Sequence, residues 1–278
     1  MNSLLAVAPP VYRYAAFTDD PAGGNPAGVV LDARGMSADE MLAVAADVGY
    51  SETAFVAPAD GGSEYGVRYF SPRAEVPFCG HATIAAAVAL GRSGDLVFNT
   101  QEGPVAVRST EQTATLTSVA PAVAHIDPDD LGELLAALGW SAGELDPELP
   151  PRIAYAGVYH PVIAAATRER LRDLDYDFDG LERLMTARNW TTVQLIWRES
   201  GDLFHARNPF PIGGIFEDPA TGAAAAAFGA YLRELGLVTP PATVTIIQGE
   251  DMGRPGRLTV DIPPGGGGIS VTGMAVRL

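Results

Sequence analysis

Apolar and polar residues alternate along most of the chain in short runs that glycine and proline interrupt. Alternation with a period of two is typical of β-strands that bury one face. Short strands joined by turns therefore dominate the predicted structure. The expected strands are residues 11–18, 28–31, 52–57, 65–70, 95–99, 104–108, 113–119, 122–126, 153–155, 161–166, 192–197, 203–206, 243–248, 257–262 and 269–276.

Helical periodicity marks fewer segments. Ser37 and Glu40 have the spacing of a capping box, which predicts a helix start at Ser37. Residues 82–90 and 219–235 are apolar on every side, and such helices must be buried all round. Residues 141–151, rich in Pro, Glu and Gly, are expected to form an exposed loop. The helices expected are residues 37–48, 82–90, 128–138, 181–188 and 219–235.

The two apolar helices have similar lead-ins. Residues 69–72 and then the polar cluster 79–83 precede the first, while residues 206–209 and the cluster 218–222 precede the second. Each half reads as a strand, a Pro-containing loop, a polar cluster and an apolar helix. Chance similarity of Ala-rich helices is the alternative explanation.

A curved sheet wrapped around each apolar helix would bury it on all sides. We therefore predict an α+β fold of two pseudo-symmetric lobes, each a curved β-sheet or barrel around a central helix. The N-terminal lobe is expected to comprise residues 1–120 and the C-terminal lobe residues 121–268. The last strand, near residues 269–278, is expected to return to the N-terminal lobe.

Charge and hydropathy narrow the possible partners. The 278 residues carry a formal net charge of −16, and no basic stripe offsets it, so nucleic acid is not an expected partner. The apolar runs are too short to span a membrane, and no leader with a basic start and an apolar core is visible. We expect a soluble, cytoplasmic protein that acts on a small molecule.

Missing residue types exclude several chemistries. All 18 basic residues are arginine, so a lysine Schiff base, including the usual attachment of pyridoxal phosphate, is excluded. Cys79 is the single cysteine, which excludes a mechanism with two thiols from one chain. A zinc site of the usual kind would need most of the four scattered histidines. We expect no metal and no cofactor, and assign no role to His125, His160 and His205.

The starts of the apolar helices are candidate anion sites. Asp218 and Pro219 have the types favoured at the N-cap and first helical position, which places Thr221 and Gly222 in the first turn. Glycine there leaves backbone N–H groups uncovered, and the helix dipole attracts a carboxylate. Residues 79–83 have the same character. Alternatively, Asp218 is only a cap.

Three further residues are candidates for chemistry. His81 follows Gly80 at a helix start, where it is a candidate acid or hydrogen-bond donor. Glu52 lies where a helix gives way to a strand, and a proton-transfer role requires it to point into a cleft rather than into solvent. Cys79 is a candidate thiol at a helix N-terminus, or a small buried residue. Residues 207–210 and 248–249 are expected to line the same cleft.

Several segments, taken together, resemble the PhzF-type isomerases of phenazine biosynthesis in order and spacing over nearly the whole chain. The CGHAT and EDPATG clusters are the most specific of them. The segments are residues 17–18 with 24–29, 51–55, 68–72 with 75–83, 217–224, and 248–249 with 254–257.

The resemblance implies the diaminopimelate-epimerase-like fold with its active site between two lobes, catalysis without a cofactor, and a homodimer. The type enzyme isomerises trans-2,3-dihydro-3-hydroxyanthranilate. By this resemblance Glu52 shuttles the proton, while His81 and Asp218 hold the substrate and assist. Gly80 and Gly222 match the backbone donors expected to bind the carboxylate.

One position departs from the family pattern, because Ala223 stands where serine often follows the glycine. A hydroxyl that contacts substrate is therefore missing, which puts the type substrate in question. We expect substrate contacts from Cys79, Gly80, Thr221, Gly222 and Ala223.

Our hypothesis is a proton-moving isomerase of a small carboxylic acid, in which residues 52, 81 and 218 meet. An epimerase or racemase with Cys79 as one base is one alternative. A catalytically silent protein that binds a small acid is another, and a metal-dependent hydrolase suffers from the poor ligand set.

Overall fold

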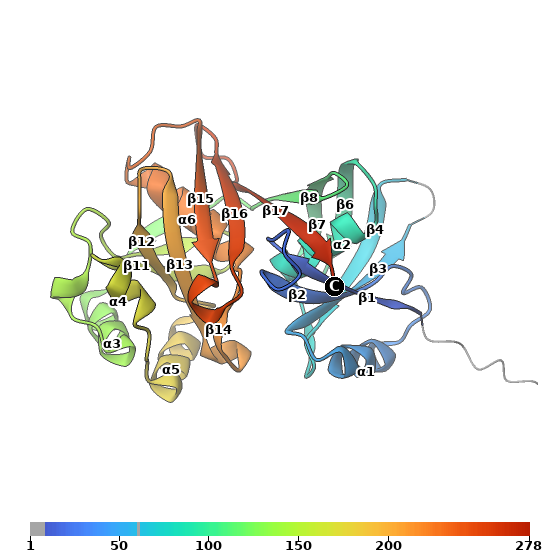
Figure 1. Ribbon diagram of the computed structural model, residues 1–278, viewed down its shortest axis with the longest axis horizontal. Coiled ribbons are helices and arrows are strands. Elements are labelled where there is room, and N and C mark those ends of the chain that lie inside the picture. Colours follow the sequence, from blue (N-terminus) through green and yellow to red (C-terminus); the bar gives the residue numbers. More distant parts are fainter. Residues whose placement is uncertain (1–8, 60–61) are drawn as a thin grey trace, which may run out of the picture. The chain divides into compact units, whose positions relative to one another are not determined.

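A computed structural model describes residues 9–59 and 62–278 (Figure 1). The chain divides into two compact units. Unit 1 comprises the described residues of Met1–Pro21, Pro26–Ala114 and Met274–Leu278, and unit 2 comprises Ala22–Asn25 and Thr115–Gly273. The chain passes from one unit to the other within three strands, β2 (Asn25–Val30), β8 (Thr113–Thr117) and β17 (Ser270–Arg277).

Unit 1 is built mainly of β-strands with two helices. Its helices are α1 (Ala38–Val48) and α2 (Gly80–Ala89). Its strands are β1 (Val11–Ala16), β2 (Asn25–Val30), β3 (Glu52–Pro58), β4 (Glu64–Phe70), β5 (Glu75–Val76), β6 (Gly94–Thr100), β7 (Gly103–Ser109), β8 (Thr113–Thr117) and the end of β17 (Ser270–Arg277).

The strands of unit 1 form a closed eight-stranded barrel. Their pairings follow the order β7, β6, β4, β3, β2, β1, β17 and β8, and the β2–β3 and β4–β6 pairs are parallel. A turn in which the Thr110 N–H donates to the Thr113 carbonyl oxygen at 2.8 Å joins β7 to β8. Because the barrel is closed, each strand has a neighbour on both sides, and no strand has an edge that is unpaired along the whole strand.

Helix α2 is the centre of unit 1. Every residue from His81 to Val88 is buried, and the helix packs against β1, β3 and β7. A helix without a polar face is stable only in such surroundings. Helix α1 is amphipathic instead, and packs Met41 and Ala45 against Phe55 and Phe70.

Unit 2 repeats this plan with more helices. Its helices are α3 (Pro128–Leu138), α4 (Arg168–Arg172), α5 (Phe178–Arg188) and α6 (Gly222–Glu234), with short 3₁₀ turns η1 (Ala142–Glu144), η2 (Pro211–Gly213) and η3 (Glu250–Met252). Its strands are β9 (Ala122–His125), β10 (Arg152–Tyr155), β11 (Tyr159–Ala164), β12 (Gln194–Arg198), β13 (Leu203–Phe210), β14 (Ile215–Asp218), β15 (Ala242–Gln248) and β16 (Gly256–Ile262).

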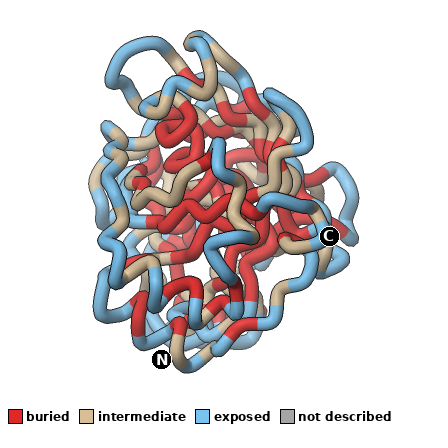
Figure 2. Tube along the Cα trace, turned by 90° about the vertical axis from the view of Figure 1, so that its left-hand side faces the viewer, coloured by how far each residue is buried: buried red, intermediate tan, exposed pale blue. Residues whose placement is uncertain are grey.

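The sheet of unit 2 curves around α6. Its pairings run in the order β9, β10, β11, β12, β13, β15, β16 and β17, with β14 added to β13. Helix α6 packs against β9, β10, β11 and β16. A separate cluster of buried apolar side chains joins α3 and α5 to the sheet. Inner segments are buried, whereas loops are exposed (Figure 2).

The predicted α+β fold, with a curved sheet around an apolar central helix, is confirmed in each unit. The predicted capping box is also present, since the Ser37 side chain accepts from the Glu40 N–H and the Glu40 carboxylate accepts from the Ser37 N–H. Residues 128–138 form α3 as expected.

The local structure differs from the prediction at four places. Helix α4 was not expected, and α5 begins three residues before residue 181 because Asp177 caps it. Within the expected loop 141–151, η1 forms and Leu149 is only 1% exposed, since Leu149 packs into the interior. Residues 206–209 continue β13, because their backbone pairs with β12 and with the unexpected strand β14.

Among the helices of the described residues, none has both the length and the hydropathy that crossing a membrane requires.

Candidate active site

Glu52 is placed by the end of α1. The helix stops at Gly49, whose φ of 72° is the left-handed conformation that glycine adopts without strain. The chain then turns into β3, of which Glu52 is the first residue. Strand β3 pairs with β2 and β4 and packs on α2, so the Glu52 backbone belongs to the rigid part of the barrel.

Cys79 and His81 are placed by the start of α2. Cys79 is the N-cap residue with an extended backbone, and its side chain makes no capping hydrogen bond. The Thr83 N–H and hydroxyl both donate to the Cys79 carbonyl oxygen, at 3.0 and 2.7 Å. The Thr83 hydroxyl also bonds the buried Tyr69 hydroxyl at 2.6 Å. These contacts fix the helix start and leave the Cys79 thiol to face other side chains.

The structure brings Glu52, Cys79 and His81 together in unit 1; we call these three residues the Glu52 cluster. Glu52 Oε2 lies 3.6 Å from Cys79 Sγ and 3.4 Å from His81 Nε2. Cys79 Sγ lies 3.4 Å from His81 Nδ1. The Ser51 hydroxyl also approaches His81 Nε2, at 3.4 Å. The two distances that do not involve sulfur are each 3.4 Å, which exceeds the length of a strong hydrogen bond. The side chains are therefore in contact without being held by strong hydrogen bonds.

Burial determines the charge of His81. The side chain is 7% exposed, and this burial lowers the pKa of His81, which the nearby Glu52 carboxylate opposes only in part. The imidazole is therefore neutral near pH 7 and has one N–H donor and one acceptor nitrogen. Glu52 remains 16% exposed, so solvent or a small molecule reaches its carboxylate.

Asp218 lies in unit 2, in a second group of polar residues. Its Oδ1 accepts from Asn25 Nδ2 at 2.8 Å and its Oδ2 from the Thr221 hydroxyl at 2.5 Å. Gln248 Nε2 donates to the Asp218 carbonyl oxygen, and Gln248 Oε1 accepts from the Thr221 N–H. We call Asn25, Asp218, Thr221 and Gln248 the Asp218 cluster. Asn25, Asp218 and Gln248 are each at most 6% exposed.

The predicted role of Asp218 as the N-cap of α6 is wrong. Asp218 ends β14, where it pairs with Asn208, and α6 begins only at Gly222 with Thr221 as its N-cap. Backbone pairing to β13 holds Asp218 extended, and its carboxylate accepts from Asn25 Nδ2 and from the Thr221 hydroxyl.

The two apolar helices nevertheless start alike. Gly80 is the first residue of α2 and Gly222 the first of α6, and each follows an N-cap whose side chain makes no capping bond. A first-turn glycine has no side chain to cover the N–H groups, so each start retains the anion-binding character of a helix N-terminus. Ala223, the second residue of α6, is half-buried and offers no hydroxyl.

The other residues predicted to line the cleft differ in their surroundings. Gln248 lies beside Asp218 and donates to its carbonyl oxygen at 2.8 Å. Arg207 instead forms a buried ion pair with Glu217 and donates to the Arg172 carbonyl oxygen at 2.7 Å, so its guanidinium is occupied in the scaffold. Sequence reasoning assigned no role to Asn25 or Ser51. Their signal was their position within the segments that resemble the family pattern.

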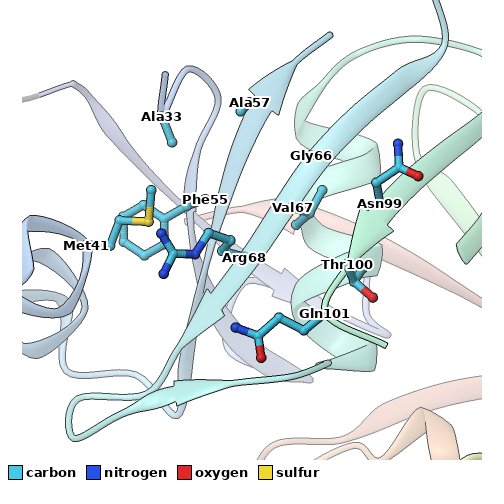
Figure 3. A pocket seen from close by; sticks show the side chains of 10 residues that line it. All are labelled: Ala33, Met41, Phe55, Ala57, Gly66, Val67, Arg68, Asn99, Thr100 and Gln101. Atoms are coloured by element: carbon cyan, nitrogen blue, oxygen red, sulfur yellow. The ribbon is translucent and has the colours of Figure 1, made fainter. Parts of the chain in front are cut away.

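A cavity of about 270 Å³ opens elsewhere in unit 1, between α1 and the strands β3, β4 and β6 (Figure 3). Phe55, Val67, Arg68, Asn99 and Gln101 line part of it. None of the Glu52 cluster contributes to its wall, and the mainly apolar lining offers no acid/base pair. We assign the cavity no role in the chemistry.

Solved structures with a similar fold include the following two. A PhzF-family phenazine biosynthesis protein of Bacillus anthracis is 25% identical and matches with a TM-score of 0.87 over 96% of both chains. A probable proline racemase of Agrobacterium radiobacter, with 11% identity, matches with a TM-score of 0.66 over 96% of this chain and 90% of that chain. The second likeness shows the shared fold alone.

Curated relatives define the class of protein. An uncharacterized isomerase of Bacillus subtilis, YfhB, is 30% identical over 96% of this chain and 95% of its own. The trans-2,3-dihydro-3-hydroxyanthranilate isomerase of Pseudomonas fluorescens is 30% identical over 86% of this chain and 85% of its own. The protein is thus an enzyme of the isomerase class. The family model for phenazine biosynthesis-like proteins (PhzC-PhzF) matches residues 14–278, and the chain belongs to that family.

Proposed function

We propose that this isomerase moves a proton between two positions of a small carboxylic acid, with Glu52 as the acid/base group. One observation supports this most: the Glu52 carboxylate, partly exposed, lies 3.4 Å from the imidazole of His81, which burial keeps neutral. A carboxylate at the edge of solvent accepts a proton, and a neutral imidazole beside it stabilises the substrate by hydrogen bonding.

The reaction needs one group that both takes and returns a proton. Glu52 removes the proton from a carbon that a neighbouring unsaturated group has acidified, and the electron pair shifts along the substrate. Glu52 then returns a proton to a different carbon, so no atom or electron is gained or lost; because Glu52 is 16% exposed, the proton it holds exchanges with solvent before it is returned. In this proposal His81 holds a polar substituent of the substrate. The N-terminus at Gly80 supplies N–H donors for the carboxylate.

The substrate we propose is a small cyclic or amino carboxylic acid. The relative from Pseudomonas fluorescens is named for trans-2,3-dihydro-3-hydroxyanthranilate, which is such a compound. Ala223 lacks the hydroxyl that serine would offer at this position, so we propose a related acid with one polar contact fewer.

Replacement of Glu52 tests the proposal. Glu52→Gln keeps the size of the side chain but removes the proton acceptor, and should slow turnover about 10²- to 10⁴-fold with folding intact. The assay follows solvent deuterium entering a panel of small acids, trans-2,3-dihydro-3-hydroxyanthranilate included, by NMR. Glu111→Gln, an exposed carboxylate in a turn of the same unit, is the matched control and should exchange at the wild-type rate. Equal rates in wild type and Glu52→Gln would refute the mechanism.

A second candidate is an epimerase or racemase with Cys79 as one base. It is favoured by the position of the thiol, 3.4 Å from His81 Nδ1 and 3.6 Å from the Glu52 carboxylate. Cys79→Ala separates the two, because the epimerase requires the thiol while the isomerase keeps most of its rate without it. A protein that binds an acid but never exchanges its protons would be a binder and not a catalyst.

A further inference from the structure

We propose that the Glu52 cluster is a site for a borderline-soft divalent cation such as Zn²⁺, held by Cys79, His81 and Glu52. We also propose that the bound cation inhibits the enzyme. The three residues are the one group in residues 9–59 and 62–278 in which at least three Cys, His, Asp or Glu side chains offer converging ligand atoms, all within 4.8 Å of one another.

The separations of the three ligand atoms fit a tetrahedral cation. Zinc binds sulfur at about 2.3 Å, nitrogen at about 2.0–2.1 Å and oxygen at about 2.0–2.2 Å, so tetrahedral angles place sulfur about 3.6 Å from each of the other two ligands and nitrogen about 3.4 Å from oxygen. Here Cys79 Sγ lies 3.6 Å from Glu52 Oε2 and 3.9 Å from His81 Nε2, and His81 Nε2 lies 3.4 Å from the same oxygen.

Two of the three separations already match, and the third is a few tenths of an ångström long. Cys79 Sγ lies nearer to His81 Nδ1, at 3.4 Å, than to Nε2, so the His81 ring must turn to direct Nε2 toward a cation held by the three residues. The backbone needs no movement, since the helix start is fixed by the hydrogen bonds from Thr83 to the Cys79 carbonyl oxygen and from Tyr69 to Thr83. Such fixed ligand positions are what a metal site requires.

The donor set selects the kind of cation. A thiolate with an imidazole and a carboxylate suits Zn²⁺, Cd²⁺ or Co²⁺, whereas Mg²⁺ and Ca²⁺ prefer oxygen ligands alone. Three protein ligands leave the fourth tetrahedral position for water. The exposed part of Glu52 provides the entry path.

Inhibition follows from which carboxylate is bound. A Glu52 oxygen that donates its lone pair to a cation no longer accepts a proton from carbon, so zinc competes with the proposed reaction. This second half of the inference rests on the proposed function, whereas cation binding does not.

Cobalt spectroscopy tests the binding directly. Full-length protein, freed of metal by a chelator, is titrated with Co²⁺, and a thiolate-to-cobalt charge-transfer band should appear at one equivalent. Because Cys79 is the only cysteine in the chain, any such band reports this site. Zinc added afterwards should abolish the band. A cobalt spectrum without the band, or with octahedral features only, would overturn the proposal.

Calorimetry with Zn²⁺ then tests each ligand. Cys79→Ser, His81→Gln and Glu52→Gln should each weaken zinc binding by at least about tenfold. Replacing a residue that only hydrogen-bonds a metal ligand already weakens metal binding by about 10- to 100-fold, so loss of a ligand should cost at least as much. Circular dichroism checks that each variant is folded. If one variant does not fold, the other two still test the site. His205→Gln is the control, because His205 contacts two carboxylates, Glu199 and Glu250, outside the cluster and should leave the affinity unchanged.

The effect of zinc on proton exchange is measured separately from zinc binding. If the wild-type enzyme exchanges protons, zinc at saturating concentration should abolish exchange, and His205→Gln should be inhibited alike. Zinc that binds at Cys79 without inhibiting, or that activates, would overturn the inhibitory role and leave the binding site standing. If no exchange is found with any acid, the proposed function fails while the cobalt and zinc measurements still decide the site.

Discussion

His160 shows how strongly a single buried residue depends on its surroundings. It lies at the interior of unit 2 with no exposed surface, and its Nδ1 bonds the Thr192 hydroxyl at 2.9 Å. Asn208, which pairs with Asp218, donates to the same hydroxyl at 3.0 Å. Within the described residues, His160 Nε2, Asn208 Oδ1 and both amide atoms of Gln194 have no hydrogen-bond partner. Groups of this kind are commonly satisfied by ordered internal water.

Burial lowers the pKa of His160 to about 4, and the hydrogen bond to Thr192 opposes this only in part. In the unfolded chain the same imidazole takes a proton below about pH 6.5. Between these values the unfolded state binds more protons than the folded state, so stability falls as pH falls through this window.

We expect unfolding free energies to reveal this residue. From about pH 7.5 to about pH 5, His160 should cost the wild type about 2 kcal/mol, following 1.36 kcal/mol per pKa unit. His160→Asn removes the titration, so its stability should change by about that much less over the same interval. Urea unfolding at the two pH values measures both. Parallel pH profiles for the two proteins would contradict the assignment.

Arg207 and Glu217 form a buried pair that supports the strand carrying Asp218. Their side chains are 9% and 3% exposed, with the Arg207 Nε donating to Glu217 Oε1 at 3.0 Å. A buried pair that loses one partner leaves an uncompensated charge, at a cost of about 3–5 kcal/mol. We therefore expect Glu217→Ala to destabilise the protein by about that amount.

The contrast with an exposed pair makes this a sharp test. Arg108 and Asp95 meet at 2.9 Å, but their side chains are 74% and 78% exposed. Exposed pairs contribute roughly 0–1 kcal/mol, so Asp95→Ala should scarcely change the unfolding midpoint. Equal losses in both variants would mean that water reaches the Arg207 pair.

At the scale of elements, α6 packs closely against neighbouring side chains at Gly229. A Cβ added there would lie 2.7 Å from Val260 Cγ1 and 2.8 Å from Ile269 Cγ2, closer than such atoms pack. Gly229→Ala should therefore destabilise by about 1–3 kcal/mol, although alanine favours helices more than glycine does.

Gly132 of α3 is the matched control. It is exposed, and a Cβ built there meets nothing within 4 Å. Gly132→Ala should stabilise by about 0.5–1 kcal/mol through the backbone entropy of glycine alone. Thermal unfolding of the two variants should thus shift in opposite directions. A stabilised Gly229→Ala would show that α6 has room to move away from β16.

Which elements could be read from the sequence depended on whether local or tertiary forces decided them. The capping box of α1 and the Asp127–Pro128 start of α3 are local signals, and both are seen. Strand β14 is set by pairing with β13, a contact that a single sequence does not display. The Asp–Pro signal at 218–219 looked equally local, yet pairing overrode it and α6 began at Gly222.

The same distinction between local and tertiary forces applies to the candidate site. Cys79 and His81 are close in sequence on one helix start, so their proximity was readable. That Glu52 lies within 3.6 Å of both depends on β3 packing on α2. The resemblance to a family selected Glu52 among many carboxylates, whereas the residue chemistry alone did not decide whether its side chain points into a cleft or into solvent.

At the scale of the whole molecule, acidic residues far outnumber basic residues. The chain has 34 acidic residues against 18 arginines, a net charge of −16. Like charges repel across the compact state and are farther apart in the unfolded chain, so the net charge destabilises folding. Salt screens such exposed charges, with a Debye length near 30 Å at about 0.01 M and near 3 Å at about 1 M.

The melting temperature should therefore rise with added salt. Screening also weakens attractive ion pairs, but the most buried of them, Arg207–Glu217, is shielded from ions, and the exposed Arg108–Asp95 pair contributes little to begin with. Repulsion among the excess carboxylates is thus the larger effect to be screened. Thermal unfolding in about 0.02 M and about 0.5 M NaCl measures the shift, and KCl should reproduce it, since screening depends on ionic strength and not on which cation is present. A melting temperature that falls with both salts would mean that specific ion pairs outweigh the repulsion of the net charge.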